Sequence, residues 1–227
     1  MIETRLETPH GTVLVLPVGA DEHALHPDEI ALAASFAPLR RRVFAAGREA
    51  MRRSLTAIGH AREDLSILSS PRGAPILPEG FRGSISHKET IAVALARRSD
   101  SHEDPHVGVD VEIDRERTID VSRRVLTDEE LGEAKDLDPR AFQAFVLRRF
   151  SMKEAIYKSI DPFLQRYVGF REVTIRGTAA PFVAVGDFHD GEPKLAIDVA
   201  FTELSIDGAR IIVSTASARR SASGGGG

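Results

Sequence analysis

The chain has 227 residues, which by a prior of roughly 150 residues per domain allows one large domain or two small ones. Its 42% hydrophobic and 28% charged residues exclude wholesale disorder, and its formal charge of −4 argues against a general nucleic-acid-binding surface, which needs a strong excess of base. Without cysteine the chain can form neither disulfides nor thiolate metal sites. It has no long uncharged apolar run and no basic segment followed by an apolar one at its start, so we expect a cytoplasmic protein with no membrane span and no signal peptide.

The first half of the chain predicts strands alternating with helices. In chain order we expect a strand at 12–16, a short helix from about 27, a longer helix at 38–58, and buried strands in GSISH (83–87) and TIAVALA (90–96). A loop rich in Pro and Gly, residues 69–82, separates the helices from these strands. The polar stretch 97–106 is the best candidate for a linker between two halves.

The second half predicts the same mixture of elements. We expect a strand at 107–113, a helix from Thr127 with a capping box to Glu130, a strong amphipathic helix at 139–160, and strands at 172–176, 195–201 and 210–216. These patterns predict an α+β fold of two similar halves packed pseudo-symmetrically, with the active site in the cleft between them. The predicted boundaries are 1–104, 105–218 and a flexible tail at 219–227 that ends in SASGGGG.

Charge is distributed unevenly along the chain. Residues 38–53 contain six Arg and one Glu, whereas residues 110–138 contain eleven acids and five bases. This asymmetry is typical of a protein that holds a polyanion at one face and a metal ion or basic partner at another. Two solvated helix faces would give the same pattern, so charge alone leaves both interpretations open.

The segment VGVDVEID, residues 107–114, is the most informative. Side chains alternate along a strand, so its branched residues share one face while Gly108, Asp110, Glu112 and Asp114 share the other. Carboxylates two residues apart lie roughly 6.6 Å apart at the backbone and can reach one hard cation such as Mg²⁺. A half-exposed strand would look similar, but a glycine inside a strand often marks close approach by a backbone or a ligand.

Further candidate residues follow from their chemistry. Glu154 and Lys158 are one helical turn apart, although spacing alone favours a surface ion pair. His87 stands among Ser84, Ser86 and Lys88, which are donors suited to phosphate, and a structural histidine is the plainer alternative. Arg40, Arg48 and Arg72 add guanidinium groups that suit phosphate or simply solvent. The sequence contains no Walker loop, GxSxG or HExxH motif.

Taken together these segments resemble the Sfp-type 4'-phosphopantetheinyl transferases, and within them the siderophore (enterobactin-synthase) subgroup. The matching text is VGVD at 107–110, FSMKEAIYK at 150–158, RRRVFAAGREAMRRSL at 40–55, RGAPILPEGFRGSISH at 72–87 and PFLQRYVGF at 162–170. The motifs occur in the family's order and cover residues 40–170. Ala74 and Arg72 depart slightly from the family's pattern, and His102 and His106 match nothing in it.

The resemblance implies an enzyme that moves 4'-phosphopantetheine from coenzyme A to a serine of an apo acyl, aryl or peptidyl carrier protein and releases 3',5'-ADP. It implies Mg²⁺, with Mn²⁺ as the alternative, held by Asp110, Glu112 and Glu154. Glu154 would deprotonate the serine and Lys158 would assist the leaving phosphate. The implied coenzyme-binding residues are Arg40, Arg48, Arg72, Ser86, His87, Asp110, Lys153 and Lys158.

Two other functions remain open at this point. One is a noncatalytic module that binds coenzyme A or a carrier protein, and the other is a Mg²⁺-dependent phosphohydrolase that uses the same carboxylates. The resemblance further implies a monomer that acts in secondary metabolism, such as siderophore synthesis, with no nucleic-acid or membrane partner. Fatty-acid, polyketide and nonribosomal-peptide synthases are all possible sources of the carrier protein.

Overall fold

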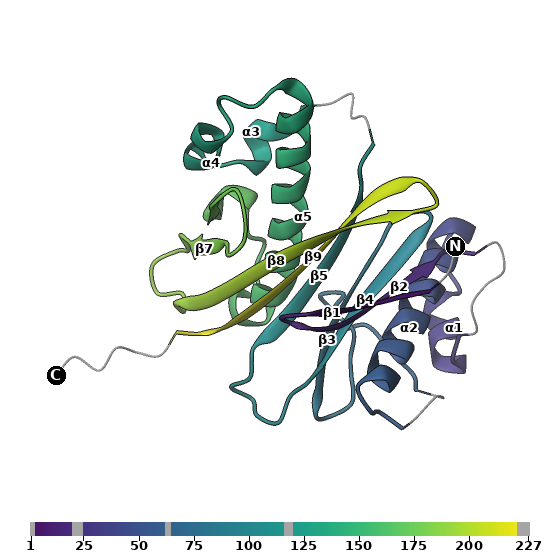
Figure 1. Cartoon of the computed structure of the whole chain (residues 1–227). Coiled ribbons are helices and arrows are strands. Elements are labelled where there is room, and N and C mark those ends of the chain that lie inside the picture. Colours follow the sequence, from purple (N-terminus) through teal and green to yellow (C-terminus); the bar gives the residue numbers. More distant parts are fainter. Residues whose placement is uncertain (1–2, 20–24, 62–64, 116–119, 222–227) are drawn as a thin grey trace.

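The computed structural model describes residues 3–19, 25–61, 65–115 and 120–221, and its mixture of helices and strands confirms the α+β class (Figure 1). Its elements are β1 (Thr4–Thr8), β2 (Gly11–Pro17), α1 (Pro27–Ala33), α2 (Pro38–Ala57), β3 (Phe81–His87), β4 (Ile91–Arg98), β5 (His106–Ile113), α3 (Ser122–Val125), α4 (Asp128–Glu133), α5 (Pro139–Leu164), the 3-10 helix η1 (Phe170–Glu172), β6 (Val173–Arg176), β7 (Val183–Gly186), β8 (Leu195–Ile206) and β9 (Ala209–Arg220). No helix in these ranges is both long and apolar enough to cross a membrane.

The first half of the chain forms a four-stranded antiparallel sheet covered by α2. The strand order is β1-β2-β4-β3, and the register pairs Val15 with Val93 and Ile85 with Ala94. One face of this sheet packs on α2, in a core formed by Leu16, Ala50, Met51, Leu55, Ile67, Ala94 and Ala96. The apolar runs of β2 and β4 are continuous, so both faces of these two strands are buried.

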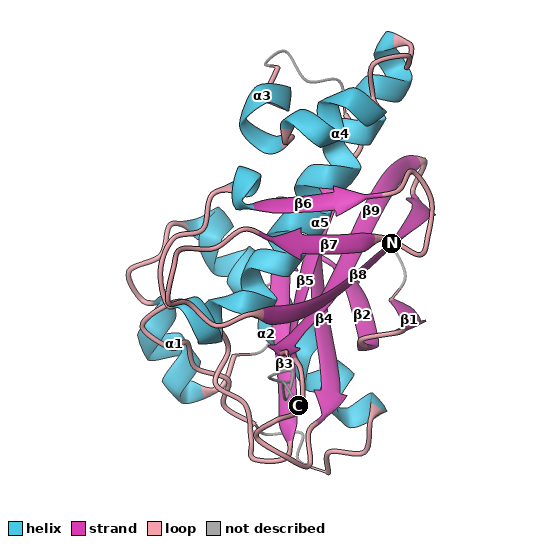
Figure 2. Ribbon diagram, turned by 90° about the vertical axis from the view of Figure 1, so that its left-hand side faces the viewer, coloured by secondary structure: helices cyan, strands magenta, loops and turns pink. Residues whose placement is uncertain are grey.

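The second half repeats this arrangement with a three-stranded antiparallel sheet covered by α5. The strand order is β5-β9-β8, and a separate hairpin pairs β6 with β7. The core beneath α5 contains Met152, Ala155, Ile156, Ile160, Val168, Val173, Ile175, Phe182, Val199, Ala216 and Ala218. Figure 2 shows α3 and α4 gathered beyond the sheets, at the same end of the molecule as the start of α5.

The two sheets meet through their other faces. A shared apolar core joins β2 and β4 of the first half to β5 and β9 of the second, and contains Val13, Val15, Ile91, Val93, Leu95, Val107, Val109, Val111, Ile211 and Val213. The branched face of β5 is buried as its alternation predicts. The opposite face of β5, which carries Gly108, Asp110 and Glu112, is consequently left to face α5.

Several elements differ from their predicted bounds. The edge strand β1 was not predicted, because Leu6 is its one apolar residue, and the short elements α3 and β7 were missed as well. Helix α5 continues beyond Pro162 and ends at the left-handed residue Gln165 (φ 49°), because a proline in the last turn removes only one helical hydrogen bond.

Strand β9 pairs as far as Arg220, so the predicted tail at 219–227 begins too early. Residues 222–227 of that tail lie outside the described part of the chain. The division into halves at residues 104 and 105 stays a prediction, and it falls in the connection between β4 and β5.

Candidate functional site at the junction of the two halves

Gly108 sets the distance between β5 and α5. A Cβ atom at this position would lie 1.9 Å from the carbonyl oxygen of Ala155 and 2.9 Å from the amide nitrogen of Ser159. No side chain fits there, so the strand and helix backbones come together as the strand glycine led us to expect. The close approach places the next inward residue of β5, Asp110, directly beside the helix.

Asp110 is the most connected carboxylate of the site. It is 4% exposed and accepts hydrogen bonds from Ser86 Oγ at 2.8 Å and Ser151 Oγ at 3.0 Å. Lys158 Nζ lies 3.2 Å from Asp110 Oδ1 and donates a shorter bond of 2.7 Å to the carbonyl oxygen of Val109. The three elements β3, β5 and α5 therefore converge on one buried carboxylate.

The edge strands β3 and β5 belong to different sheets but run side by side in one direction. Three side-chain contacts join them at a constant offset of 24 residues: Arg82 to His106, Ser86 to Asp110, and Lys88 to Glu112. The offset is constant, and successive contacts are separated by an even number of residues, so all three lie on one face of this seam. The first half thus presents polar groups to Asp110 and Glu112 of the second.

Glu112 and Glu154 complete the acidic part of the site. Glu112 is buried and accepts a hydrogen bond of 2.6 Å from Lys88 Nζ. Burial raises the pKa of Glu154, and the negative charge of Asp110 raises it further, while Lys158 and Lys88 oppose the rise. The three carboxylates predicted as metal ligands thus influence one another. Within the described ranges, however, no group of three or more His, Cys, Asp or Glu side chains is arranged to hold a metal ion.

A basic pocket lies beside this carboxylate cluster. Its lining comes from α2, the 69–73 loop and the turn after β3, and consists of Phe36, Ala37, Leu39, Arg40, Val43, Phe44, Arg48, Ser69, Gly73, His87, Lys88 and Glu89. Arg48 is buried and donates to Ile67 O (2.8 Å) and Ser69 Oγ (2.6 Å), and burial lowers its pKa to about 10. Arg40 is exposed, with its guanidinium 4.5 Å from the centre of the Phe36 ring.

His87 lies among positive charges. Loss of solvent around the ring lowers its pKa, even though the side chain keeps an exposed edge, and the charges of Lys158, Lys88, Arg48 and Arg40 lower it further. This accumulation of cations is unfavourable unless an anion offsets it. The pocket is therefore suited to a phosphate group.

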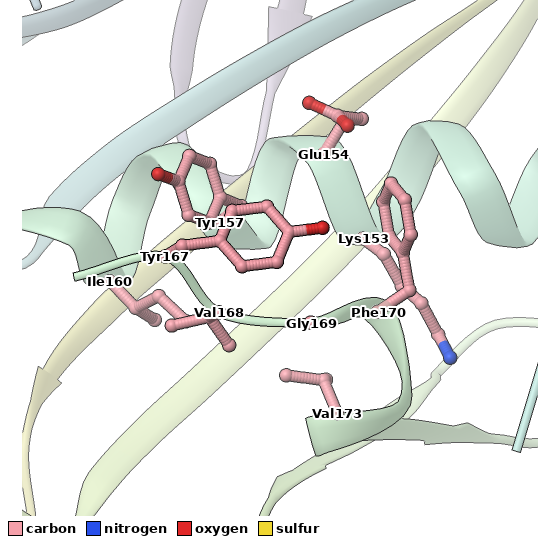
Figure 3. Close-up of a pocket in the computed structure, with 9 residues that line it drawn as sticks. All are labelled: Lys153, Glu154, Tyr157, Ile160, Tyr167, Val168, Gly169, Phe170 and Val173. Carbon is pink, nitrogen blue, oxygen red and sulfur yellow. The ribbon is translucent and has the colours of Figure 1, made fainter. Parts of the chain in front are cut away.

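A second pocket, with fewer charged residues in its lining, opens beside Glu154. It is lined by Lys153, Glu154, Tyr157, Ile160, Tyr167, Val168, Gly169, Phe170 and Val173 (Figure 3). Figure 3 shows Glu154 and Lys153 leaving α5 on different sides, with the rings of Tyr157 and Tyr167 near one another beside the helix. The centroids of these two rings are 6.4 Å apart.

Two of the residues predicted to bind the coenzyme are engaged elsewhere. Lys153 is 3% exposed, and its ammonium donates to Glu130 Oε2 (2.6 Å) and to the carbonyl of Val125 (2.7 Å). Burial lowers the pKa of Lys153 to about 8, although Glu130 favours its charged form. In this structure Lys153 therefore holds α3 and α4 against α5, and its phosphate contact stays a prediction.

Arg72 forms an ion pair across the two halves. Its Nε and Nη2 atoms lie 2.5–3.0 Å from the Asp161 carboxylate on α5, and Nη2 also donates to the carbonyl of Arg166 at 3.3 Å. The hydrogen bond to Asp161 raises the pKa of Arg72. In this arrangement Arg72 joins the 69–73 loop to the helix that carries Glu154 and Lys158, and its phosphate contact stays a prediction.

Sequence reasoning missed Ser151 and gave Lys88 too small a role. Ser151 precedes Glu154 by three residues and Lys158 by seven, a spacing that places all three on one helical face. Lys88 follows His87 directly, and the parallel seam that brings it to Glu112 cannot be recognised without the pairing of the two halves.

Comparisons with known proteins identify the family. Residues 28–97 match the model described as "4'-phosphopantetheinyl transferase N-terminal domain", and residues 106–208 match the "4'-phosphopantetheinyl transferase superfamily". The chain is 32% identical over 180 residues to "4'-phosphopantetheinyl transferase Npt" from Nocardia iowensis, covering 77% of this chain and 76% of the relative.

Solved structures with a partial likeness include a holo-ACP synthase from Plasmodium yoelii, with 18% identity, a TM-score of 0.39, and coverage of 51% of this chain and 94% of that one. Another is a holo-(acyl-carrier-protein) synthase from Bacillus anthracis in complex with CoA (3',5'-ADP), with 19% identity, a TM-score of 0.37, and coverage of 51% and 96%.

The matches define the class of protein as a group-transferring enzyme. The chain belongs to the 4'-phosphopantetheinyl transferase family, and the resemblance to its Sfp-type members is confirmed. The siderophore subgroup stays a prediction.

Proposed function

We propose that the enzyme transfers 4'-phosphopantetheine from coenzyme A to a serine hydroxyl of an apo carrier protein, with Mg²⁺, and releases 3',5'-ADP. The observation that carries this proposal is the position of the basic pocket directly beside the buried carboxylates, with Lys88 contacting Glu112 and also lining the pocket. A diphosphate needs cations around its oxygens, and a serine needs a base to become a nucleophile. The basic pocket would supply the cations and Glu154 the base, and Lys88 links that pocket to the carboxylates.

Each group has a role that its surroundings support. Arg40, Arg48, His87 and Lys88 would bind the phosphates of the coenzyme. Glu154 would accept the serine proton, and its raised pKa brings it closer to the operating pH of a general base. Lys158, which is held by Val109 O and Asp110, would stabilise negative charge on the leaving phosphate.

The donor set suits a hard divalent cation. Asp110, Glu112 and Glu154 offer carboxylate oxygens, which Mg²⁺ prefers, and their mutual repulsion is relieved by positive charge. The ion, when bound, would offset charge on the phosphates. Because these side chains do not form a ready-made cluster in this arrangement, we expect Glu112 and Glu154 to reorient when the ion and the donor bind.

The decisive test is mass spectrometry of apo carrier proteins incubated with the enzyme, coenzyme A and Mg²⁺. Panels from fatty-acid, polyketide, nonribosomal-peptide and siderophore synthases would show which acceptor gains the mass of one phosphopantetheine group. Modification of a siderophore or other secondary-metabolism carrier would support the proposed subgroup and pathway. Unmodified carriers with phosphopantetheine released into solution would favour the phosphohydrolase, and no turnover at all would favour a binding module.

Two carboxamide variants test the carboxylates themselves. Asp110→Asn and Glu154→Gln keep the shape of each side chain. Glu154→Gln removes the base and should lower transfer by at least about 10²-fold, and Asp110→Asn removes a charged ligand of the cation and should lower transfer strongly as well. Circular dichroism and the thermal midpoint check that the fold is retained. Near-normal transfer by either folded variant would contradict the assigned role.

We further propose that the enzyme is a monomer, because one chain supplies every residue of the proposed site, and that it acts in the cytoplasm, as the sequence led us to expect. Sedimentation of the free enzyme tests the oligomeric state directly. A dimer whose dissociation abolished transfer would contradict this part of the proposal.

A further inference from the structure

Lys88 occupies a position between two charge centres. Its Nζ atom lies 2.6 Å from Glu112 Oε1, on a carboxylate that is 5% exposed, whereas the Lys88 side chain is itself 36% exposed. The same lysine lines the basic pocket with Arg40, Arg48 and His87. Lys88 therefore contacts the acidic cluster through its ammonium group and also lines the pocket proposed for phosphate.

The backbone of Lys88 is fixed while its side chain is long. Lys88 N donates to Ile91 O at 2.8 Å, and Ile91 N donates to Lys88 O at 3.4 Å, which closes the turn between β3 and β4. A lysine has four rotatable side-chain bonds, so its ammonium can change partners without any movement of this turn. An exchange between Glu112 and a phosphate in the adjoining pocket needs only rotamer changes.

We infer that Lys88 is an exchangeable counter-ion that couples the binding of the divalent cation to the binding of the phosphate donor. Without donor it neutralises Glu112 and competes with a cation for that carboxylate. A phosphate in the basic pocket offers Lys88 a second partner, and its competition with the cation for Glu112 is then relieved. By reciprocity, the donor tightens cation binding by the same factor as the cation tightens donor binding. This inference rests on the proposed cation site.

The test is Mn²⁺ binding to the whole enzyme, measured by electron paramagnetic resonance or calorimetry with and without coenzyme A. Lys88→Met removes the competing charge, so without coenzyme A it should bind Mn²⁺ roughly three- to tenfold more tightly than the wild type. The gain in Mn²⁺ affinity on adding coenzyme A should be smaller than in the wild type, because the exchange is lost. Lys88→Arg keeps the charge and should remain close to the wild type.

Lys135→Met is the matched control, since Lys135 is an exposed lysine after α4 and its loss removes the same charge from the surface. Equal Mn²⁺ affinities of Lys88→Met, Lys135→Met and the wild type would overturn the inference but leave the proposed cation site in place. Mn²⁺ binding that is absent from the wild type, or unchanged by Asp110→Asn, would remove the proposed cation site and the inference with it. Calorimetry of coenzyme A binding in the absence of metal shows whether the donor pocket is intact, and so separates both of these failures from loss of that pocket.

Discussion

The desolvation and positive charges around the His87 imidazole should make the affinity for coenzyme A depend on pH. Desolvation and four neighbouring cations lower its pKa in the free enzyme, so the ring is neutral at neutral pH. A bound phosphate offsets those cations and raises the pKa, so binding takes up a proton between the two values. The affinity for coenzyme A should therefore fall as pH rises through the pKa of the complex, by up to about tenfold per unit.

Calorimetric titration of coenzyme A against wild type and His87→Gln from mildly acidic to neutral pH tests this prediction. The coenzyme phosphate also titrates in that range, but its ionisation is common to both proteins and cancels in the ratio of their affinities. We expect the ratio to approach a constant at higher pH and to favour the wild type increasingly at lower pH. A ratio independent of pH would place His87 outside the phosphate site.

Among the secondary-structure elements, the arrangement of the site depends on the packing of β5 against α5. Gly108→Ala would place a Cβ atom 1.9 Å from the Ala155 carbonyl oxygen, a backbone atom that cannot move without the helix. Overpacking typically costs 1–3 kcal/mol, and we expect about 3 kcal/mol here, together with loss of transfer as Ser151 and Lys158 move away from Asp110.

Thermal unfolding monitored by circular dichroism measures this effect. Gly132→Ala in α4 is the matched control, because nothing lies within 4 Å of its added Cβ, and alanine favours a helix by up to about 1 kcal/mol over glycine. If Gly108→Ala unfolded at the wild-type temperature, the strand and helix would have to be less closely packed than the structure shows.

The elements that carry the site could be predicted from sequence because each has a strong local pattern. The period-two alternation of β5 placed Asp110 and Glu112 on one face, and the apolar period of α5 placed Glu154 and Lys158 on another. The partners of these groups could not be predicted in the same way. Lys153 reaches Glu130 and Arg72 reaches Asp161, 23 and 89 residues away, and no local pattern specifies such contacts.

At the scale of the whole molecule, the two halves are joined by an apolar core and by the polar seam between β3 and β5. Apolar contacts in the core have no preferred direction, whereas the hydrogen bonds of the seam fix the register at which the carboxylates of β5 meet Ser86 and Lys88. The seam ends at Arg82 and His106, far along the strands from Lys88. Arg82 also donates to Ser99 Oγ at 2.9 Å and to the carbonyl of His102 at 2.9 Å, so it joins the connection between the halves to both of them.

His106 makes the stability of this junction depend on pH. Burial and the charge of Arg82 lower the pKa of His106 to about 4, so the neutral ring accepts a hydrogen bond from the guanidinium and packs edge-on against Phe163, with centroids 5.1 Å apart. The unfolded chain protonates this histidine near its usual pKa of about 6.5. Between about pH 6.5 and about pH 4 the unfolded state alone takes up the proton, so stability is fully present above this window and falls through it.

Urea unfolding at several pH values measures the effect, because the contribution of one such group approaches about 1.4 kcal/mol per pH unit within the window. His106→Asn keeps an acceptor for Arg82 but cannot titrate, so its free energy of unfolding should depend less steeply on pH than that of the wild type. The exposed His102 provides the matched control, and His102→Asn should retain the wild-type slope. Equal slopes for His106→Asn and the wild type would mean that folding does not lower the pKa of His106, and the ring could then not be buried against Arg82 as described.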